Sequence, residues 1–348
     1  MFKFDFGGED IDDDMEDVQQ GEEVVSTEEE VKSGSILYPK MYDIEVLLNN
    51  MPSRMSYTLL PAYLSAAAIP RREVFDIKMQ IMADEDETEE DEFVKKELQL
   101  LLSHTEDLRT DIYEGGLKSW EGAGDLVELL VAEDVNIGDG ILELGCGSAL
   151  PSLHLFQKHI ASLPSNPQPV TFILSDYNYS VLRLMTAPNF LLAYYNTFNT
   201  PAEETEWELE ITESLISEFL SFLSANLISL KFVAGSWDSA AFADILGYGT
   251  RPGPGKLLYS TILAAETIYS PASLRNFTSL LFDASNHWGE TTGVPVLVAA
   301  KEIYFGVGGT VRQFSELVQE HGMSISVRRR ITGRTSGVAR VVLQITRG

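Results

Sequence analysis

Cysteine is almost absent from this chain, which has a single one, Cys146, among 348 residues. A lone cysteine excludes an intrachain disulfide framework and a zinc site built from several thiolates. Basic residues are scarce too, because 25 lysines and arginines face 53 aspartates and glutamates, for a net charge of −28. Nucleic-acid backbones are bound by clustered basic side chains, so we expect no direct nucleic-acid binding.

The chain also lacks the marks of a membrane or metal protein. It has no apolar run of membrane-spanning length, and no basic stretch followed by an apolar one near residue 1. Its five histidines show no metal-ligand spacing. We therefore expect a soluble intracellular protein with no membrane contact and no metal site. Hydrophobic residues make up 44% of the chain, which suffices for a packed core.

Acidic residues gather in two runs that divide the chain. Residues 1–33 contain 13 acids and two bases, and residues 84–92 contain eight acids and no base. Such runs repel themselves and bury nothing, so we predict an acidic disordered tail at 1–33 and an acidic loop at 84–92. They either solubilise the protein or steer a basic partner towards it. Residues 34–112 are predicted to form an N-terminal extension packed on the core, and residues 113–348 the main domain.

From residue 113 onward, apolar runs alternate with amphipathic segments. We predict strands at 140–145, 170–176, 230–235, 257–265 and 295–300, and helices at 125–132, 150–162, 180–196, 212–226, 271–284 and 310–320. This alternation predicts an α/β fold with a doubly wound, mostly parallel sheet. Two final strands, 323–330 and 338–345, should pair as an antiparallel edge hairpin, which makes seven strands. The stretch 197–211 is interpreted as a loop insertion.

Sheets of this kind bind ligands beyond the carboxyl ends of their strands. The first predicted strand runs into a glycine turn with the sequence Leu-Gly-Cys-Gly-Ser at 144–148. Gly145 and Gly147 allow a ligand to approach the backbone closely. Leu150 stands where a dinucleotide motif has its third glycine, which counts against a pyrophosphate at the helix start.

The next two predicted strands end in residues suited to a nucleoside. Asp176 ends the second strand, where a carboxylate can accept both ribose hydroxyl protons, with Tyr177 and Asn178 flanking the same pocket. Asp176 can instead cap the following helix. The stretch 235–237, Gly-Ser-Trp, ends the third strand, where the indole can wall an adenine. That tryptophan can instead be a core residue, with Asp238 as a helix cap.

Glu266 and Tyr269 follow the fourth predicted strand, beside the expected reacting centre. Glu266 can orient an incoming nucleophile and Tyr269 can wall it in, or Glu266 can cap the next helix. The glycine-rich stretch 304–309 after the fifth strand is a candidate substrate lid. Before the first strand, Trp120 can cover an apolar ligand face and Glu121 can hold an amino group, or they can pack and cap a helix.

Six motifs together carry a family resemblance. They are Glu-Gly-Gly-Leu-Lys-x-Trp-Glu (114–121), Leu-Glu-Leu-Gly-Cys-Gly-Ser (142–148), Ser-Asp-Tyr-Asn (175–178), Gly-Ser-Trp (235–237), Glu-Thr-Ile-Tyr (266–269) and Lys-x-x-Tyr-Phe-Gly-Val-Gly-Gly (301–309). In this order they resemble the eukaryotic protein-histidine N-methyltransferases that modify a histidine of a large-subunit ribosomal protein. The resemblance covers roughly residues 34–348.

The resemblance implies a Rossmann-like class I methyltransferase fold with S-adenosylmethionine as cofactor. It implies catalytic roles for Glu266 and Tyr269. The implied cofactor contacts come from Ser119, Trp120, Glu121, Gly145, Gly147, Asp176, Tyr177, Asn178, Gly235, Ser236, Trp237 and Ala265. Ala265 stands where many relatives have serine, so its contact is expected through the backbone alone.

The expected partner is a protein substrate, a basic ribosomal protein, met in the cytoplasm and nucleus by a monomeric enzyme. Two alternatives stay open. Related protein-lysine methyltransferases share the fold and tend to carry Asp-x-x-Tyr at 266–269. A non-catalytic escort of a ribosomal protein is the other, and intact Gly145, Gly147, Asp176 and Glu266 argue against it.

Deleting residues 1–33 should leave the melting temperature nearly unchanged, because their 13 acids against two bases disfavour a packed core. Thermal unfolding of the full chain and the truncated chain checks this. A large drop in the melting temperature would show instead that the tail contributes to the fold.

Overall fold

The computed structural model describes residues 37–49, 51–60, 67–74, 116–199, 207–247, 259–286, 294–332 and 338–347. The predicted acidic tail 1–33 and acidic loop 84–92 lie outside these residues. The described residues belong to one unit, which runs from Leu37 to Gly348. Among them, no helix is both long and apolar enough to cross a membrane.

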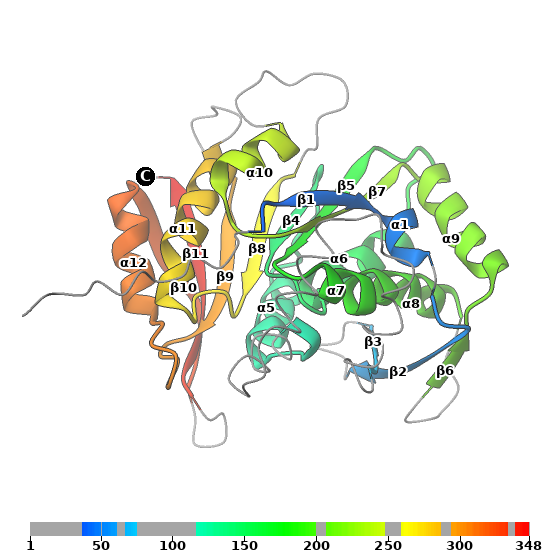
Figure 1. Cartoon of the computed structure of the whole chain (residues 1–348), viewed down its shortest axis with the longest axis horizontal. Coiled ribbons are helices and arrows are strands. Elements are labelled where there is room, and N and C mark those ends of the chain that lie inside the picture. Colours follow the sequence, from blue (N-terminus) through cyan, green and yellow to red (C-terminus); the bar gives the residue numbers. More distant parts are fainter. Residues whose placement is uncertain are drawn as a thin grey trace, which may run out of the picture. The chain divides into compact units, whose positions relative to one another are not determined.

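An eight-stranded sheet organises this unit, with the strand order β1-β7-β5-β4-β8-β9-β11-β10 (Figure 1). Five neighbouring strands run parallel: β7 (Ile228–Ala234), β5 (Val170–Asp176), β4 (Gly140–Leu144), β8 (Thr261–Ala265) and β9 (Val296–Lys301). β11 (Arg340–Arg347) pairs antiparallel with β9, and β10 (Met323–Ile331) pairs antiparallel with β11. The predicted doubly wound sheet with an antiparallel edge hairpin is confirmed.

The sheet has one strand more than the seven predicted. β1 (Lys40–Asp43) lies antiparallel to β7 at the edge opposite the hairpin, with Lys40 facing Ala234. It leads directly into the short helix α1 (Ile44–Leu48). A strand of four residues is too short to show a period-two pattern, and its partner lies far along the chain, so local sequence could not reveal it.

A second sheet has the order β3-β2-β6 and is antiparallel. It consists of β2 (Arg54–Leu60), β3 (Ile69–Arg72) and β6 (Trp207–Glu210). The interpretation of 197–211 as a loop insertion is therefore wrong over β6. Tyr57 is buried beside Trp207, with ring centroids 5.9 Å apart, so the pairing is stabilised by contacts between segments distant in sequence.

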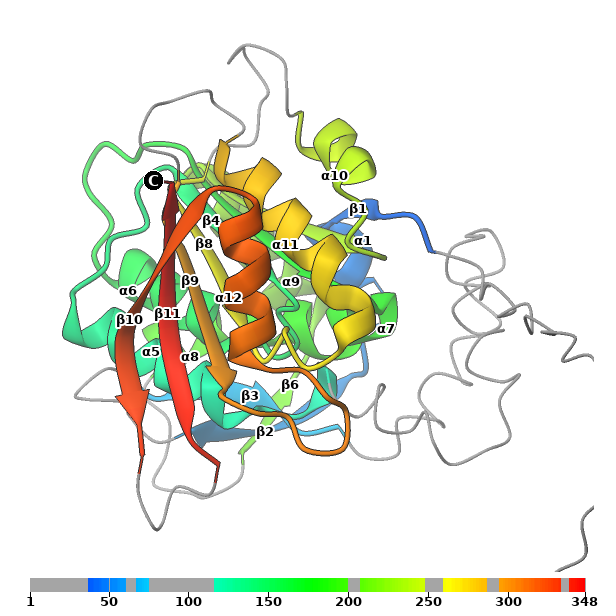
Figure 2. The ribbon, with the colours of Figure 1, turned by 90° about the vertical axis from the view of Figure 1, so that its left-hand side faces the viewer.

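Helices cover both faces of the large sheet (Figure 2). One face packs on α5 (Glu121–Ala132), α6 (Leu150–Ala161), α8 (Ala187–Phe198) and α9 (Glu213–Ala225). The other packs on α10 (Ser239–Leu246), α11 (Pro271–Asn286) and α12 (Val311–Glu320). Alternate strand residues serve the two faces: in β8, Leu263 joins the first core, while Ile262 and Ala264 join the second.

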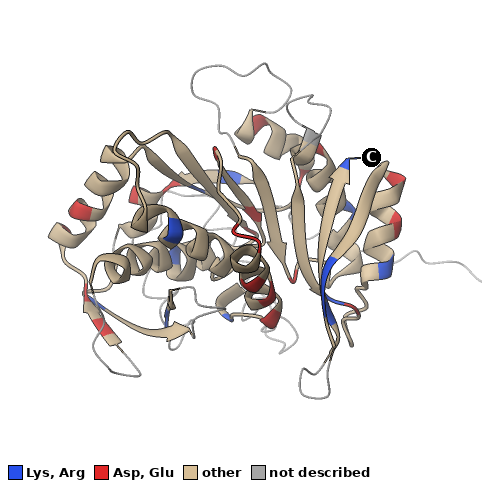
Figure 3. Cartoon of the chain, turned by 180° about the vertical axis from the view of Figure 1, so that it is seen from behind, with Lys and Arg blue, Asp and Glu red and all other residues tan. Residues whose placement is uncertain are grey.

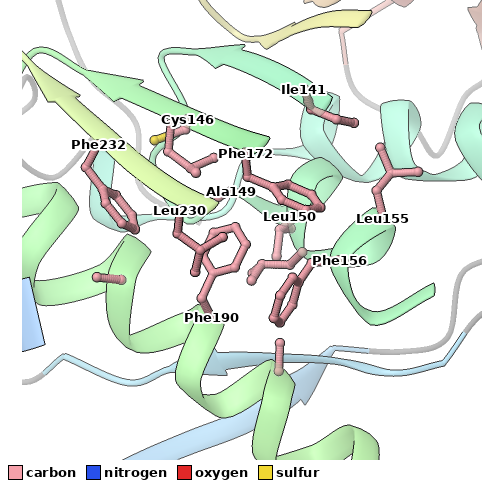
Figure 4. Packing of buried hydrophobic residues seen from close by; sticks show 14 of the residues in the cluster. Ile141, Cys146, Ala149, Leu150, Leu155, Phe156, Phe172, Phe190, Leu230 and Phe232 are labelled. Carbon is pink, nitrogen blue, oxygen red and sulfur yellow. The ribbon is translucent and has the colours of Figure 1, made fainter. Parts of the chain in front are cut away.

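Aromatic rings fill the first core (Figure 4). Phe156 of α6 contacts Phe172 of β5 and Phe190 of α8, with centroids 5.7 and 5.1 Å apart and steep interplanar angles. Phe190 in turn contacts Phe232 of β7 at 6.4 Å. Edge-to-face contacts of this kind favour one relative placement of helix and strand, so they fix α6 and α8 against the sheet.

Two predicted helices differ from the structure at one end or in the middle. α5 begins at Glu121, four residues before the predicted 125, although Gly122 and Gly124 are poor helix formers. The predicted helix 180–196 is divided into α7 (Tyr179–Val181), a π-helical turn η2 (Leu182–Thr186) and α8. Pro188 lies at the start of α8, where its missing N–H interrupts the regular ladder.

Ion pairs join α5 to the edge hairpin. Acidic residues in α5 and directly after it pair with basic residues of β10 and β11: Arg328 with Glu133, Arg329 with Glu128, and Arg340 with Asp125. Figure 3 shows the acidic and basic residues of the chain in red and blue. The Arg340–Asp125 pair is the most buried of these, with both side chains about a tenth exposed and both carboxylate oxygens hydrogen-bonded to the guanidinium. It fixes the start of α5 to the end of the sheet.

Replacing Arg340 with leucine should reduce the free energy of unfolding by about 3–5 kcal/mol, because it leaves the Asp125 carboxylate buried without its partner. Urea unfolding measures the loss. Arg312→Ala is the matched control, since Arg312 pairs with Glu316 one turn away and is 87% exposed. We expect the control to cost at most about 0.5 kcal/mol. Equal losses in the two variants would contradict a structural role for the buried pair.

Candidate active site

The predicted site residues meet along one edge of the large sheet, the one formed by the carboxyl ends of its parallel strands. β4 pairs with β5 on one side and with β8 on the other. The strand order therefore reverses at β4: β5 and β7 extend the sheet on one side of it, and β8 and β9 on the other. In an open α/β sheet the loops diverge at such a switch point and leave room for a ligand. The glycine turn, Asp176, the stretch 235–237 and the stretch 266–269 all follow the carboxyl ends of these parallel strands.

The glycine turn between β4 and α6 needs both of its glycines. Gly145 and Gly147 adopt φ values of +65° and +49°, which favour glycine. A Cβ on Gly145 would lie 2.6 Å from Cγ2 of Thr267, and one on Gly147 would lie 3.0 Å from the carbonyl oxygen of Gly116. The turn is therefore packed against the chain on both sides, and its backbone conformation is fixed.

Asp176 ties this turn to β5. Its Oδ2 accepts a hydrogen bond from the Gly147 amide at 3.0 Å, and its Oδ1 accepts one from the Asn178 amide at 3.2 Å. Burial raises the pKa of the Asp176 carboxyl to about 6, and these amides act in the opposite direction. A carboxylate has about four lone-pair sites, so Asp176 can still accept ligand hydroxyl protons. One of its two bonds goes to the glycine turn, and no side chain caps α7, which argues against a capping role for Asp176.

A second buried carboxylate stabilises the helix that follows the turn. Glu143 in β4 accepts hydrogen bonds from both the amide and the hydroxyl of Ser152 in α6. Burial raises its pKa to about 7. Cys146 between the glycines is buried and faces Thr186, whose hydroxyl donates to the Gly147 carbonyl at 2.6 Å. These residues hold the turn in place.

The stretch 235–237 also adopts a conformation that depends on glycine. Gly235 has a φ of +126°, and a Cβ there would lie 2.7 Å from the backbone of Pro39. The Ser236 amide donates to the Leu37 carbonyl at 2.8 Å. Asp238 caps α10 by accepting from the Ala241 amide, which confirms the cap alternative for that residue. The N-terminal segment thus packs directly on this part of the candidate site.

Several buried polar atoms at this edge have no hydrogen-bond partner. They are the indole Nε1 of Trp237 and the hydroxyls of Ser236, Thr267 and Ser175. The indole packs against Phe277 with a centroid distance of 4.9 Å, so it is also part of the second core. Buried polar groups are nearly always satisfied in a native protein, so these groups at the strand ends are available to hydrogen-bond a polar ligand.

Glu266 lies at the end of β8 in a strained conformation. Its φ is +58°, which is uncommon for a residue with a Cβ. Its Oε1 accepts from the Gly122 amide at 3.2 Å, and its Oε2 accepts from the hydroxyl of Tyr304 at 2.6 Å. Burial raises the pKa of the Glu266 carboxyl, and the Tyr304 hydroxyl acts in the opposite direction. The carboxylate is therefore fixed from two other segments of the chain and does not cap the following helix.

Trp120 and Glu121 meet a lysine from the end of β9. The Lys301 ammonium lies 4.9 Å from the centre of the Trp120 ring and 3.7 Å from Oε2 of Glu121. The pKa of the Glu121 carboxyl is lowered, first by its own backbone amide and then by Lys301. Ser119 lies beside the glycine turn, with its hydroxyl 3.0 Å from that of Ser148. The loop before α5 thus reaches the same edge as the strand ends.

The remaining predicted residues differ in exposure. Tyr177 and Tyr269 are 42% and 38% exposed, whereas Asn178 is buried. Burial raises the pKa of the Tyr269 hydroxyl. Ala265 ends β8 and is half-buried. Among the described residues no three histidine, cysteine, aspartate or glutamate side chains are placed to share a metal ion.

Sequence reasoning missed several residues that shape the site. Tyr304 and the Gly122 amide bind Glu266, Lys301 links Trp120 to Glu121, and Thr267 packs against Gly145. The sequence assigns Tyr304 to a candidate substrate lid, a role that makes no use of its hydroxyl. A tyrosine in a glycine-rich motif was the available signal, but nothing local identifies its partner.

These features fit the cofactor implied by the resemblance. A buried carboxylate at the end of β5 suits ribose hydroxyls, and the unsatisfied indole and hydroxyl groups after β7 and β8 suit the polar edges of a nucleoside. A Cβ on Gly145 would fill space beside Trp237 and Thr267. Asp176 and the stretch 235–237 would hold the nucleoside half of S-adenosylmethionine, and the glycine turn would lie beside its methionine half.

Replacing Asp176 with alanine should weaken S-adenosylmethionine binding by about 1.5–3 kcal/mol, the range for hydrogen bonds to a charged group. Binding should also depend on pH in the wild type. The folded pKa of about 6 exceeds the ordinary 3.8, so the carboxylate is lost as the pH falls from 7 to 5, and affinity should fall with it. Asp176→Asn is the control, with an affinity that stays flat over this range in calorimetric titrations. Equal affinity and equal pH dependence in all three proteins would contradict the assignment of Asp176 to the cofactor site.

Solved structures resemble the chain distantly, and no protein-family model matches it. Magnesium protoporphyrin IX methyltransferase (ChlM) from Synechocystis PCC 6803, with bound SAH, is 11% identical with a TM-score of 0.37 and covers 78% of this chain and 100% of that one. The methyltransferase domain of bacterial CtHen1-C is 17% identical with a TM-score of 0.36 and covers 65% of this chain and 96% of its own.

Curated sequences are much more similar. Histidine protein methyltransferase 1 of Saccharomyces cerevisiae is 33% identical over 356 residues, which cover 92% of this chain and 90% of that protein. The Schizosaccharomyces pombe protein of the same name is 34% identical and covers 79% of this chain and 75% of its own. The Dictyostelium discoideum homolog is 30% identical and covers 71% and 62%. At this identity, along nearly the whole chain, the protein belongs to the histidine protein methyltransferase family.

Proposed function

We propose that this enzyme transfers the methyl group of S-adenosylmethionine to an imidazole nitrogen of a histidine in a basic protein of the large ribosomal subunit. The observation that carries the proposal is the Glu266 carboxylate, which Gly122 and Tyr304 hold at the end of β8 beside the glycine turn. The family supports histidine as the acceptor, since the curated relatives are named for it.

The chemistry asks little of the protein beyond alignment. The cofactor, when bound, supplies a methyl group on a positively charged sulfur, which is already a good electrophile. A neutral imidazole is nucleophilic near pH 7, because its reference pKa is about 6.5. Alignment of the two reactants can supply several kcal/mol of the barrier reduction. The residues of this chain therefore have to bind the cofactor and the acceptor, orient them relative to each other, and exclude water from the site.

Glu266 provides the orientation in this proposal. An imidazole reacts at the nitrogen that bears no proton, so the other nitrogen must hold its N–H and donate it to an acceptor. The Glu266 carboxylate retains lone pairs beyond those used by the Gly122 amide and the Tyr304 hydroxyl. One of these can accept the imidazole N–H and so select the reactive tautomer. Tyr269, partly exposed on the same loop, would form a wall of the acceptor site.

Charge favours a basic partner. The chain carries a net charge of −28, and its sequence pI is about 4.4. Opposite net charges raise the rate at which two proteins meet and make that rate sensitive to salt. A ribosomal protein is a strongly basic polypeptide, so it fits this field. With such a substrate, we propose that the enzyme acts in the cytoplasm and the nucleus, as the resemblance implies.

The pH dependence of single-turnover methylation tests the acceptor. A histidine acceptor needs only neutral imidazole, so the rate should level off above about pH 7 to 7.5. A lysine acceptor must lose a proton against a pKa of about 10.4, so its rate should still climb above pH 8. The measurement uses stripped large-subunit ribosomal proteins across pH 6–10, with amino-acid analysis of the product. Methyl-lysine, or a rate still rising steeply at pH 9, would promote the lysine alternative.

Glu266→Gln, in the same assay, separates orientation from cofactor binding. The amide keeps the size of the side chain but accepts the imidazole N–H less well, so transfer should slow while the cofactor affinity barely changes.

A further inference from the structure

We propose that the loop after β9 carries the docking surface for the substrate segment that flanks the acceptor histidine. The surface consists of the side chains of Ile303, Phe305 and Val307, and we call it the apolar ridge. It is defined by exposure, by anchoring to Glu266, and by the absence of charge within the loop. The inference rests on the proposed function, because it takes Glu266 as the residue that meets the acceptor.

The three side chains are unusually open to solvent for apolar residues. Ile303, Phe305 and Val307 are 47%, 76% and 54% exposed. They occupy alternate positions, while Tyr304 between the first two is buried. Single exposed apolar residues are common on protein surfaces, but a cluster within five residues beside a reacting centre marks an interaction site.

Other exposed aromatic side chains lie at the same edge of the sheet. Trp120 precedes α5, and its ring contacts Lys301 at the start of this loop. Tyr177 and Tyr269 follow β5 and β8. The apolar ridge therefore continues a surface that surrounds the strand ends and is not an isolated patch.

Backbone hydrogen bonds anchor the base of this loop. Ile303 and Thr310 form an antiparallel bridge, and the Tyr304 amide donates to the Gly309 carbonyl at 2.9 Å. The Gly309 amide donates to the Tyr269 carbonyl at 2.9 Å. A Cβ on Gly309 would lie 2.2 Å from the Ile268 carbonyl oxygen, so only glycine permits this contact. The loop thus presents its apolar side chains from a fixed base on the 266–269 segment.

Tyr304 sets the distance between the ridge and the acceptor. Its hydroxyl donates to Glu266 at 2.6 Å and accepts from the Lys301 amide at 3.2 Å, so its ring spans the gap between the loop and the carboxylate. Phe305 is the next residue. The ridge is therefore one tyrosine side chain and one peptide unit from Glu266. An extended substrate advances about 3.3 Å per residue, so it covers that distance in about four residues.

The chemistry of the ridge identifies its occupant as protein. Residues 303–310 contain no charged side chain, so they cannot attract a nucleic-acid backbone. Apolar side chains within about four residues of the acceptor histidine would lose exposed surface on contact with Phe305 and its neighbours. We therefore expect the substrate to carry at least one large apolar residue in that window, although the protein as a whole is basic.

The experiment compares Phe305→Ala and Val307→Ser with the wild type. Initial methylation rates are measured against the concentration of large-subunit ribosomal proteins freed of RNA, at saturating cofactor. We expect the apparent KM to rise about tenfold for Phe305→Ala and a few-fold for Val307→Ser, with kcat within about twofold, because truncating an aromatic anchor weakens an interface most. Phe305→Leu should recover much of the affinity. Cofactor affinity, measured by calorimetry, should not change.

Two control variants match the ridge in exposure and residue type. Phe198→Ala in α8 and Val327→Ser in β10 alter side chains that are 52% and 50% exposed and away from the strand ends. Both should leave KM at the wild-type value. Wild-type KM in the ridge variants would overturn the inference, as would equal increases in the controls. Light scattering compares the oligomeric state of the wild type and of Phe305→Ala. A dimeric wild type together with a monomeric variant would assign the ridge to a second copy of the chain and would also overturn the inference.

These outcomes are separable from failure of the proposed function. If the wild type makes methyl-histidine and the ridge variants match it, the ridge alone is wrong. If the wild type makes methyl-lysine, the acceptor is wrong, and the same KM comparison still tests the ridge as a docking surface for that substrate.

Discussion

The parallel pairing of β4 with β5 and with β8 is the constraint on which the site depends. Because these strands run in the same direction, their carboxyl ends meet at one edge, and the loops that follow them share one space. Both faces of the sheet are covered by helices, so the parallel strands are mostly apolar, and the polar residues that we assign to the site lie at or beyond their ends. Every residue that we assign to the site lies at that edge or is bonded to a residue there.

Within this frame, two carboxylates connect elements that are far apart in sequence. Asp176 joins β5 to the glycine turn through the Gly147 amide. Glu266 joins β8 to the start of α5 through the Gly122 amide and to the loop after β9 through Tyr304. Burial raises the pKa of both carboxyls, and their hydrogen-bond donors act in the opposite direction. Structure and chemistry therefore rest on the same hydrogen bonds.

Much of this arrangement could be predicted from the sequence. Apolar runs of five to seven residues separated by amphipathic segments indicated the parallel strands, and the polar residues directly after them indicated the site edge. The same reasoning failed for β1 and β6, because four residues carry too little periodicity and the partners of both strands lie elsewhere in the chain. It also failed at the start of α5, where Gly122 disfavours a helix locally but its amide is held by Glu266. Individual roles in the site remain predictions, and the boundaries of the tail and the extension do too.

The sequence by itself determined the fold class, the glycine turn and which strand each group of site residues follows, since each of these depends on local composition and spacing. Only the tertiary structure decided which groups meet. The positive φ of Glu266, its bonds to Gly122 and Tyr304, and the contact of Gly309 with the Ile268 carbonyl join segments that are separate along the chain. Such contacts depend on how strands and helices pack in three dimensions, and no local pattern encodes them.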